Sequence, residues 1–315
     1  MKGLMLVKAA KLLVKTNGRV SEAKEMAKDD LKVAAYLEKS LVSGASSSGN
    51  PLVTTDIVAR EFAEYAFSQS VPGKLMMRAM QFPFMTKVGA ISGIGSGWVK
   101  EGTAVQVRKG NVDTSDVLNP FKIASLVVLS DELIRLATPG TDLAIRNVMV
   151  SSAVRDIDKK FLSADAEVDE LSPAGAFYNA PSASSMSELI EKHVNNGNSV
   201  FGSSLVMPQT AVLNLTSDQL RQFELLGISV IPSQYSTNIS LIDPANMLIN
   251  VEGAGLMTAK EGTVEMVDNP ESNINEPHHS EQVSLYQTNS AAIMVTIFCG
   301  WVNSGKPVTV LEQTS

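Results

Sequence analysis

One short stretch of the chain combines the residue types that bind zinc. Glu276-Pro277-His278-His279, with Asp268 and Glu271 upstream, offers imidazole and carboxylate ligands. Adjacent histidines on an extended backbone point to opposite sides, however, and the remaining histidine, His193, lies far away in the sequence. We therefore expect a solvated loop tip and no metal site.

The glycines Gly93, Gly95 and Gly97 resemble a phosphate-binding loop at first sight. Their spacing is G-x-G-x-G, whereas dinucleotide-binding and Walker loops have other spacings and lead into a helix. A tryptophan strand follows here instead. A flexible joint explains the glycines better, because glycine adopts backbone conformations closed to other residues. We predict no cofactor.

Residues suited to catalysis are few. The sequence has no G-x-S-x-G elbow, and its three histidines lie in polar surroundings. The single cysteine, Cys299, lies in an apolar segment, which favours a buried hydrophobic role over a nucleophilic one. Two acid pairs, Asp156 with Asp158 and Asp165 with Asp169, lie near a predicted helix end, and we expect them exposed, without a cleft to raise a pKa. We predict no catalytic residue.

Charged residues of both signs lie along a polar stretch that separates two strand-like segments. The pattern predicts an exposed two-stranded arm, which is marginally stable alone and becomes stable by lying on a neighbouring subunit. Charges on such an arm can set its register against the neighbour, although each contributes little affinity. The residues that we assign to this arm are Trp98, Lys100, Glu101, Arg108, Lys109, Asp113 and Asp116.

A return strand from Phe121 to Leu129 precedes a long helix that we predict from Thr141 to Leu162. Pro139-Gly140 ends the turn before this helix, and Thr141 can cap it. Its apolar side chains recur at helical spacing and form one stripe. The stripe consists of Leu143, Val150, Val154, Ile157 and Phe161.

The first 43 residues show helical periodicity, with a break between two helices at Asn17-Gly18. They carry nine basic and five acidic residues, whereas the rest of the chain is acidic. The Ser/Gly-rich run Ser43–Pro51 predicts a protease-accessible linker. We interpret residues 1–43 as a detachable basic segment; the alternative is a helical extension packed on the body.

The remaining elements alternate between helix and strand. Residues 163–184 predict a loop, and the strands between 228 and 266 are expected to complete a mixed sheet. The predicted segments are a helical pattern over 52–82 broken at Val71-Pro72-Gly73, a strand Phe82–Val88, a helix Ser187–Val194, a strand Ser204–Met207, a helix capped by Thr216, strands Ile228–Ile231, Ser240–Ile242, Met247–Val251 and Thr263–Met266, and closing strands Val283–Leu311.

This order of motifs resembles the tailed-phage major capsid family, whose subunit has the Hong Kong ninety-seven phage fold. The family's "W-V-x-E-G" strand, "S-x-E-L" return and acidic "D-x-x-F-L" helix end each have a counterpart. The matching residues are Trp98, Val99, Glu101 and Gly102; Ser130, Glu132 and Leu133; Asp158, Phe161 and Leu162; Gly227–Ile231; and Tyr286–Asn289, Ala291–Trp301 and Lys306-Pro307.

The resemblance implies an α+β fold with an N-terminal arm, an extended two-stranded loop, a long spine helix in a peripheral domain, and a mixed-sheet axial domain. It also implies an order of segments along the chain. These are 1–43, an assembly segment; 44–82, linker and N-arm; 83–130, strands bearing the extended loop; 131–184, the spine helix; 185–280, the axial domain; and 281–315, closing strands.

The function implied is a major capsid protein, not an enzyme, that forms hexamers and pentamers of an icosahedral shell around double-stranded DNA. Its expected partners are copies of itself, a portal, and a phage protease or decoration proteins, with no sequence-specific DNA contact. We expect it in the virion after assembly in the host cytoplasm. An encapsulin-type compartment protein and a soluble cytoplasmic α+β enzyme stay open as alternatives.

One departure from the family concerns covalent cross-linking of shells. Lys109 and Asn289 fit the lysine and asparagine that certain relatives join, but the expected glutamate falls near Thr296, and Ala291–Trp301 contains no acid. Without a base the amine stays charged. We therefore do not predict cross-linking.

Composition is typical of a globular protein: 44% of the 315 residues are hydrophobic and 19% are charged. The net charge of −7 argues against tight binding to a phosphate backbone. No apolar run approaches the ~20 residues of a membrane span, and Lys8 and Lys11 interrupt a signal-peptide pattern. We expect no membrane contact and no export.

Overall fold

The computed structural model divides into two compact units, each assembled from three stretches of the chain. Unit 1 comprises Met1–Ser70, Lys122–Asp156 and Val251–Phe298, and unit 2 comprises Val71–Phe121, Ile157–Asn250 and Cys299–Ser315. These units do not test the six consecutive segments, which stay a prediction. The structure describes residues 3–28, 30–42, 57–92, 111–136, 139–267 and 280–312.

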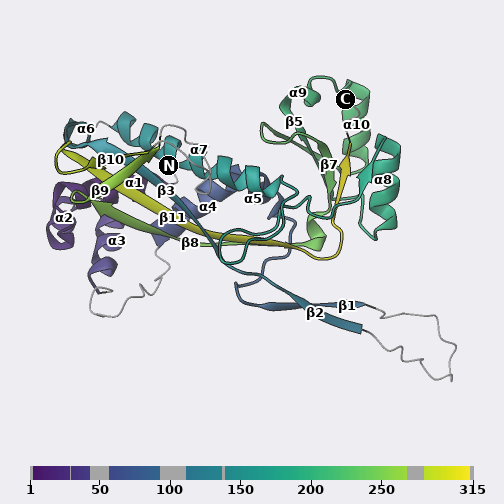
Figure 1. Ribbon diagram of the computed structural model, residues 1–315, viewed down its shortest axis with the longest axis horizontal. Coiled ribbons are helices and arrows are strands. Elements are labelled where there is room, and N and C mark those ends of the chain that lie inside the picture. Colours follow the sequence, from purple (N-terminus) through teal and green to yellow (C-terminus); the bar gives the residue numbers. More distant parts are fainter. Residues whose placement is uncertain are drawn as a thin grey trace. The chain divides into compact units, whose positions relative to one another are not determined.

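The N-terminal part of unit 1 is helical (Figure 1). It contains α1 (Leu4–Lys15), α2 (Val20–Met26), α3 (Leu31–Val42) and α4 (Ile57–Gln69). α1 ends in a turn where Asn17 and Gly18 have φ angles of 51° and 78°, and the Gly18 N–H donates to the Leu13 carbonyl at 2.8 Å. This is the predicted break. The prediction of only two helices is wrong, because a second turn separates α2 from α3.

Helix α5 (Val71–Leu75) is the first element of unit 2. The helical pattern is broken as predicted, but one residue earlier, at Ser70, and Val71-Pro72-Gly73 begin a second, short helix. Proline is tolerated there, since the N–H groups of a first helical turn have no intrahelical partner.

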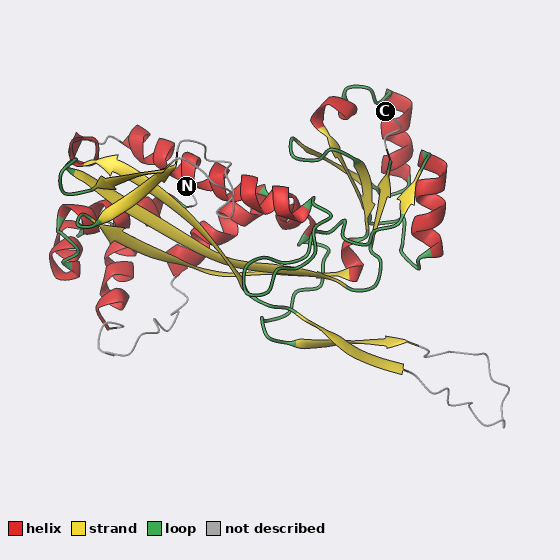
Figure 2. Cartoon of the chain, viewed as in Figure 1, coloured by secondary structure: helices red, strands yellow, loops and turns green. Residues whose placement is uncertain are grey.

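Strands β1 (Lys87–Ser92) and β2 (Asn111–Val117) form an antiparallel ribbon in unit 2 (Figure 2). Within the described part of the chain this ribbon pairs with no other strand. The strand predicted over Phe82–Val88 begins later, at Lys87, because a turn precedes it in which Met85 has a φ of 62°.

A three-stranded sheet has the order β3-β11-β8. Its strands are β3 (Phe121–Ser130), β8 (Met247–Ala259) and β11 (Ser290–Asn303). β9 (Thr263–Val267) and β10 (Ser280–Ser284) pair with each other as a separate hairpin-like sheet. The prediction that Met247–Val251 and Thr263–Met266 complete the axial sheet is therefore wrong. Strand periodicity identifies a strand but not its partner across the fold.

Two helices follow β3. They are α6 (Asp131–Leu136) and α7 (Pro139–Phe161). α7 matches the long helix predicted from Thr141 to Leu162 within two residues. It begins earlier because proline suits the first helical position, so Pro139 starts the helix where a stop was expected.

Unit 2 contains a five-stranded mixed sheet of order β4-β12-β7-β5-β6, with helices beside it (Figure 1). The Thr216 cap is confirmed: its side chain and that of Gln219 form a capping box. Leu189, Leu205, Met207, Phe223 and Leu241 build the core of this region. The elements are β4 (Ser182–Ala183), α8 (Met186–Asn195), β5 (Ser204–Pro208), α9 (Gln209–Val212), α10 (Ser217–Leu225), β6 (Ser229–Ser233), β7 (Ile239–Ile242), the 3-10 helix η2 (Pro244–Asn246) and β12 (Val308–Leu311).

Candidate functional site

Only part of the predicted arm lies within the residues that the structure describes. Asp113 and Asp116 lie on β2, where their backbones face Ala90 and Val88 of β1. Trp98, Lys100, Glu101, Arg108 and Lys109 lie outside the described residues, as do Gly93–Gly97 and His278-His279. Their assignment to an assembly arm stays a prediction.

The apolar face of α7 differs from the predicted stripe. Val150, Ile157 and Phe161 are buried, whereas Leu143 and Val154 are only half-buried. The most deeply buried positions follow a strict four-residue repeat that the predicted stripe includes only in part. This repeat consists of Ile145, Met149, Ala153, Ile157 and Phe161. The spacing was present in the sequence and could have revealed the missed residues.

A buried ion pair joins α1 to the first turn of α7. Lys11 Nζ lies 2.5 Å from Asp142 Oδ1, and both side chains are about one-tenth exposed, at 10% and 9%. The amino end of a helix favours a carboxylate, because the helix dipole is positive there. No local pattern in the sequence predicts this pair, since its partners are 131 positions apart.

Asp158 corrects the prediction that the acids near the end of α7 are exposed. Its side chain is buried, and Oδ1 accepts a hydrogen bond from the Val71 N–H at the start of α5, at 2.7 Å. Burial raises the pKa of this carboxyl to about 6, although the hydrogen bond and nearby Lys74 act in the opposite direction. The group therefore fixes the start of α5.

The other acids of these two pairs are solvated. Asp156 contacts Arg155 at 3.0 Å, and Asp165 lies 3.8 Å from Lys160, with about half or more of each carboxylate side chain exposed. Among the residues that the structure describes, no three His, Cys, Asp or Glu side chains gather as metal ligands. Asp156, Asp165 and Asp169 are thus exposed, as predicted.

His193 and Cys299 are both buried. The surroundings of His193 are polar, as predicted, but the side chain is fully buried: its ring nitrogens contact the hydroxyls of Thr309 and Ser203 at 3.3 and 3.2 Å inside unit 2. Burial lowers the pKa of His193, which favours the neutral ring. Burial raises the pKa of Cys299 to about 12, so its thiol is unreactive.

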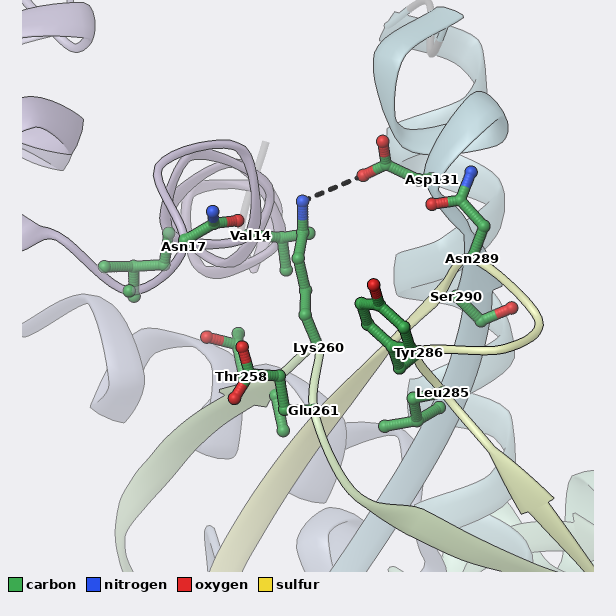
Figure 3. A pocket seen from close by; sticks show the side chains of 13 residues that line it. Val14, Asn17, Asp131, Thr258, Lys260, Glu261, Leu285, Tyr286, Asn289 and Ser290 are labelled. Carbon is green, nitrogen blue, oxygen red and sulfur yellow. Dashed lines mark hydrogen bonds and ion pairs between the residues drawn. The ribbon is translucent and has the colours of Figure 1, made fainter.

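A pocket of about 480 Å³ lies in unit 1 between the end of α1, the start of α6 and two turns (Figure 3). Lys260 extends through it, and its Nζ lies 2.9 Å from Asp131 Oδ1. Tyr286 and Asn289 belong to the neighbouring turn, and the Asn289 carbonyl accepts the Asp131 N–H. An ammonium held in an ion pair has no free lone pair for attack. The arrangement anchors the turns to α6.

Thr296 occupies the position where a cross-linking relative is expected to have glutamate. Its hydroxyl accepts the Gly255 N–H at 3.2 Å, so the side chain faces β8 within the sheet. A hydroxyl in this position cannot act as the carboxylate base.

The described part of the chain contains no helix long and apolar enough to cross a membrane.

Comparison with known proteins gives one related sequence and several related folds. No protein-family model matches the chain. The capsid polyprotein of Pseudomonas phage PAJU2 is 25% identical over an alignment 348 positions long, which covers 95% of this chain and 52% of the relative. The chain thus spans about half the length of that curated relative.

Three chains from solved phage structures share the fold. Those of Mycobacterium phages Cain and Adephagia have TM-scores of 0.55 and 0.54, each with 14% identity, and cover 78% of this chain and 91% of their own. That of Microbacterium phage Oxtober96 has a TM-score of 0.52 and 12% identity, and covers 87% of this chain and 97% of its own. The predicted fold class is confirmed. Sequence and fold together confirm the resemblance of this chain to the tailed-phage major capsid family.

Proposed function

We propose that this chain is a phage major capsid protein, a structural protein that assembles with copies of itself into the shell of the virion. The observation that carries the proposal is the similarity to a phage capsid polyprotein along 95% of the chain, together with a fold shared with chains from phage structures. The mechanism is geometric, since many identical contacts add up to a closed container.

The finer assignments follow from the same proposal. Hexamers and pentamers close an icosahedral shell around double-stranded DNA in the host cytoplasm, with a portal and with protease or decoration proteins as further partners. The ribbon β1–β2 supports the arm role, because it pairs only with itself among the described strands. An isolated ribbon of this kind is marginally stable in water. A neighbouring copy would supply the missing contacts.

The six segments predicted along the chain retain their roles in this proposal, with residues 131–184 as the spine region and 185–280 as the axial region. The acidic balance of the sequence fits a wall that encloses DNA without gripping it. Nothing among the described residues favours an encapsulin-type shell or a cytoplasmic enzyme.

The test is expression of the full chain alone, followed by size-exclusion chromatography and negative-stain microscopy. Closed shells or ring-shaped capsomers are expected. A stable monomer or dimer that never assembles on concentration would overturn the proposal of a self-sufficient shell protein.

A further inference from the structure

Helix α1 is enclosed on its body-facing side by apolar residues of unit 1. Leu6, Val7 and Ala10 are at most 2% exposed. They close, with residues of α7, β8 and β11, around a space too small for a water molecule. The residues that meet α1 there are Ile145, Met149, Leu256, Ile293 and Val295. Separating α1 from them would expose a continuous apolar surface, which is unfavourable in water.

A neighbouring face of α1 packs against α2 and α3. Ala9, Ala23, Ala27, Val33 and Leu37 form one buried cluster, against which Leu256 of β8 also packs. α1 is therefore the centre of a small helical layer whose core continues into the sheet. Separating this layer from the sheet would open its own core as well.

Polar contacts fix the position of the layer. The Lys11–Asp142 pair is buried, and losing one partner would leave the other charge without compensation. At the other end of α1, Gly3 has a φ of 76°, and a Cβ there would lie 3.3 Å from the Phe62 ring. The same Cβ would lie 3.5 Å from Arg146 of α7 and 3.6 Å from the Tyr65 ring of α4, so the chain enters α1 in close contact with both helices. The layer has one defined seat.

These contacts do not depend on the covalent connection to α4. The layer ends with α3 at Val42, and α4 begins at Ile57. The sequence between them includes the Ser/Gly-rich run Ser43–Pro51. None of the residues that make the contacts described above belongs to this run.

We infer that residues 4–42 form a separate docking module, which stays bound to the body of unit 1 after the chain is cut between α3 and α4. The detachable segment expected from the sequence would therefore not leave on cleavage alone. Its departure requires a second step that opens the Lys11–Asp142 pair and covers the apolar seat. This inference concerns the subunit itself and does not depend on shell formation.

The experiment inserts the recognition sequence of a site-specific protease between Ser46 and Ser47 of the full chain. The cut protein is run on size-exclusion chromatography at micromolar concentration, and the fractions are resolved by denaturing electrophoresis. Both fragments are expected to elute together, in whatever oligomer the chain forms. A free N-terminal fragment, whether the body stays soluble or precipitates, would overturn the inference.

Three variants sharpen the test. Lys11→Met should weaken the association by at least about a hundredfold, because Asp142 is left buried and unpaired. Lys32→Met is the matched control, since Lys32 is exposed on α3, and it should elute as the unmodified cut chain does. The double change Lys11→Met and Asp142→Leu removes both charges and should restore co-elution. If the N-terminal fragment were released from the double variant but not from Lys11→Met, the proposed role of the Lys11–Asp142 pair would be contradicted.

Discussion

Helix α7 and the β1–β2 ribbon differ in how many contacts they make with the rest of the chain. α7 buries a five-residue stripe from Ile145 to Phe161 against other parts of the same chain, and its buried carboxylates each have a partner. The ribbon forms backbone pairs only between its own two strands, within the described part of the chain. Contacts within the subunit therefore hold α7 in position. Under the proposed function, the ribbon gains its remaining contacts from a neighbouring copy of the chain.

The largest expected change in stability comes from a substitution on the buried face of α7. Phe161 is fully buried, and its ring meets Trp301 edge-on with centroids 5.3 Å apart. Phe161→Ala should lower the free energy of unfolding by about 3–5 kcal/mol, because it removes apolar contacts and leaves a cavity. Denaturant unfolding of the unassembled subunit measures the change.

Val148 provides the matched control on the same helix, since it is 58% exposed. Val148→Ala should change stability by less than about 0.5 kcal/mol. Equal losses from the two variants would mean that the stripe is not the supporting face of α7.

Local sequence patterns predicted many of the helices and strands, whereas contacts between distant parts of the chain could not be predicted. Period-2 patterning identified β3, and a capping box identified the start of α10, because both signals are local. The sequence did not reveal that Asp142 and Asp158 are buried, since their partners Lys11 and Val71 are distant in the chain. Nor did it place β8 and β9, because strand pairing is set by long-range contacts.

The second prediction concerns the pH dependence contributed by Asp158. Its folded pKa of about 6 lies above the ordinary value of 3.8, so the folded state holds this proton more tightly. The resulting stabilisation is fully present below pH 3.8, is lost as the pH rises through about 6, and amounts to at most about 3 kcal/mol. Asp158→Asn keeps an acceptor for the Val71 N–H and should remove this slope.

Stability of the two proteins measured between pH 4 and pH 7 tests this prediction. The difference between wild type and Asp158→Asn should change in favour of the variant as the pH rises. A constant difference across this range would show that the carboxyl does not titrate there.

A smaller effect is expected in the sheet beside α1. A Cβ at Gly255 would lie 2.5 Å from Thr296 Oγ1, which accepts the Gly255 N–H. Gly255→Ala should cost about 1–3 kcal/mol through this overlap. Combining it with Thr296→Ala should recover part of the loss in thermal unfolding, and no recovery would locate the strain elsewhere.

The ribbon should show the opposite behaviour, with little effect on subunit stability and a large effect on assembly. The most direct test compares the full chain with a variant in which residues 87–117 are replaced by a short Gly/Ser turn. Thermal unfolding and sedimentation velocity are measured on both. The account predicts similar unfolding, with shells or capsomers only for the full chain. Equal assembly of both proteins, or none by the full chain, would contradict it.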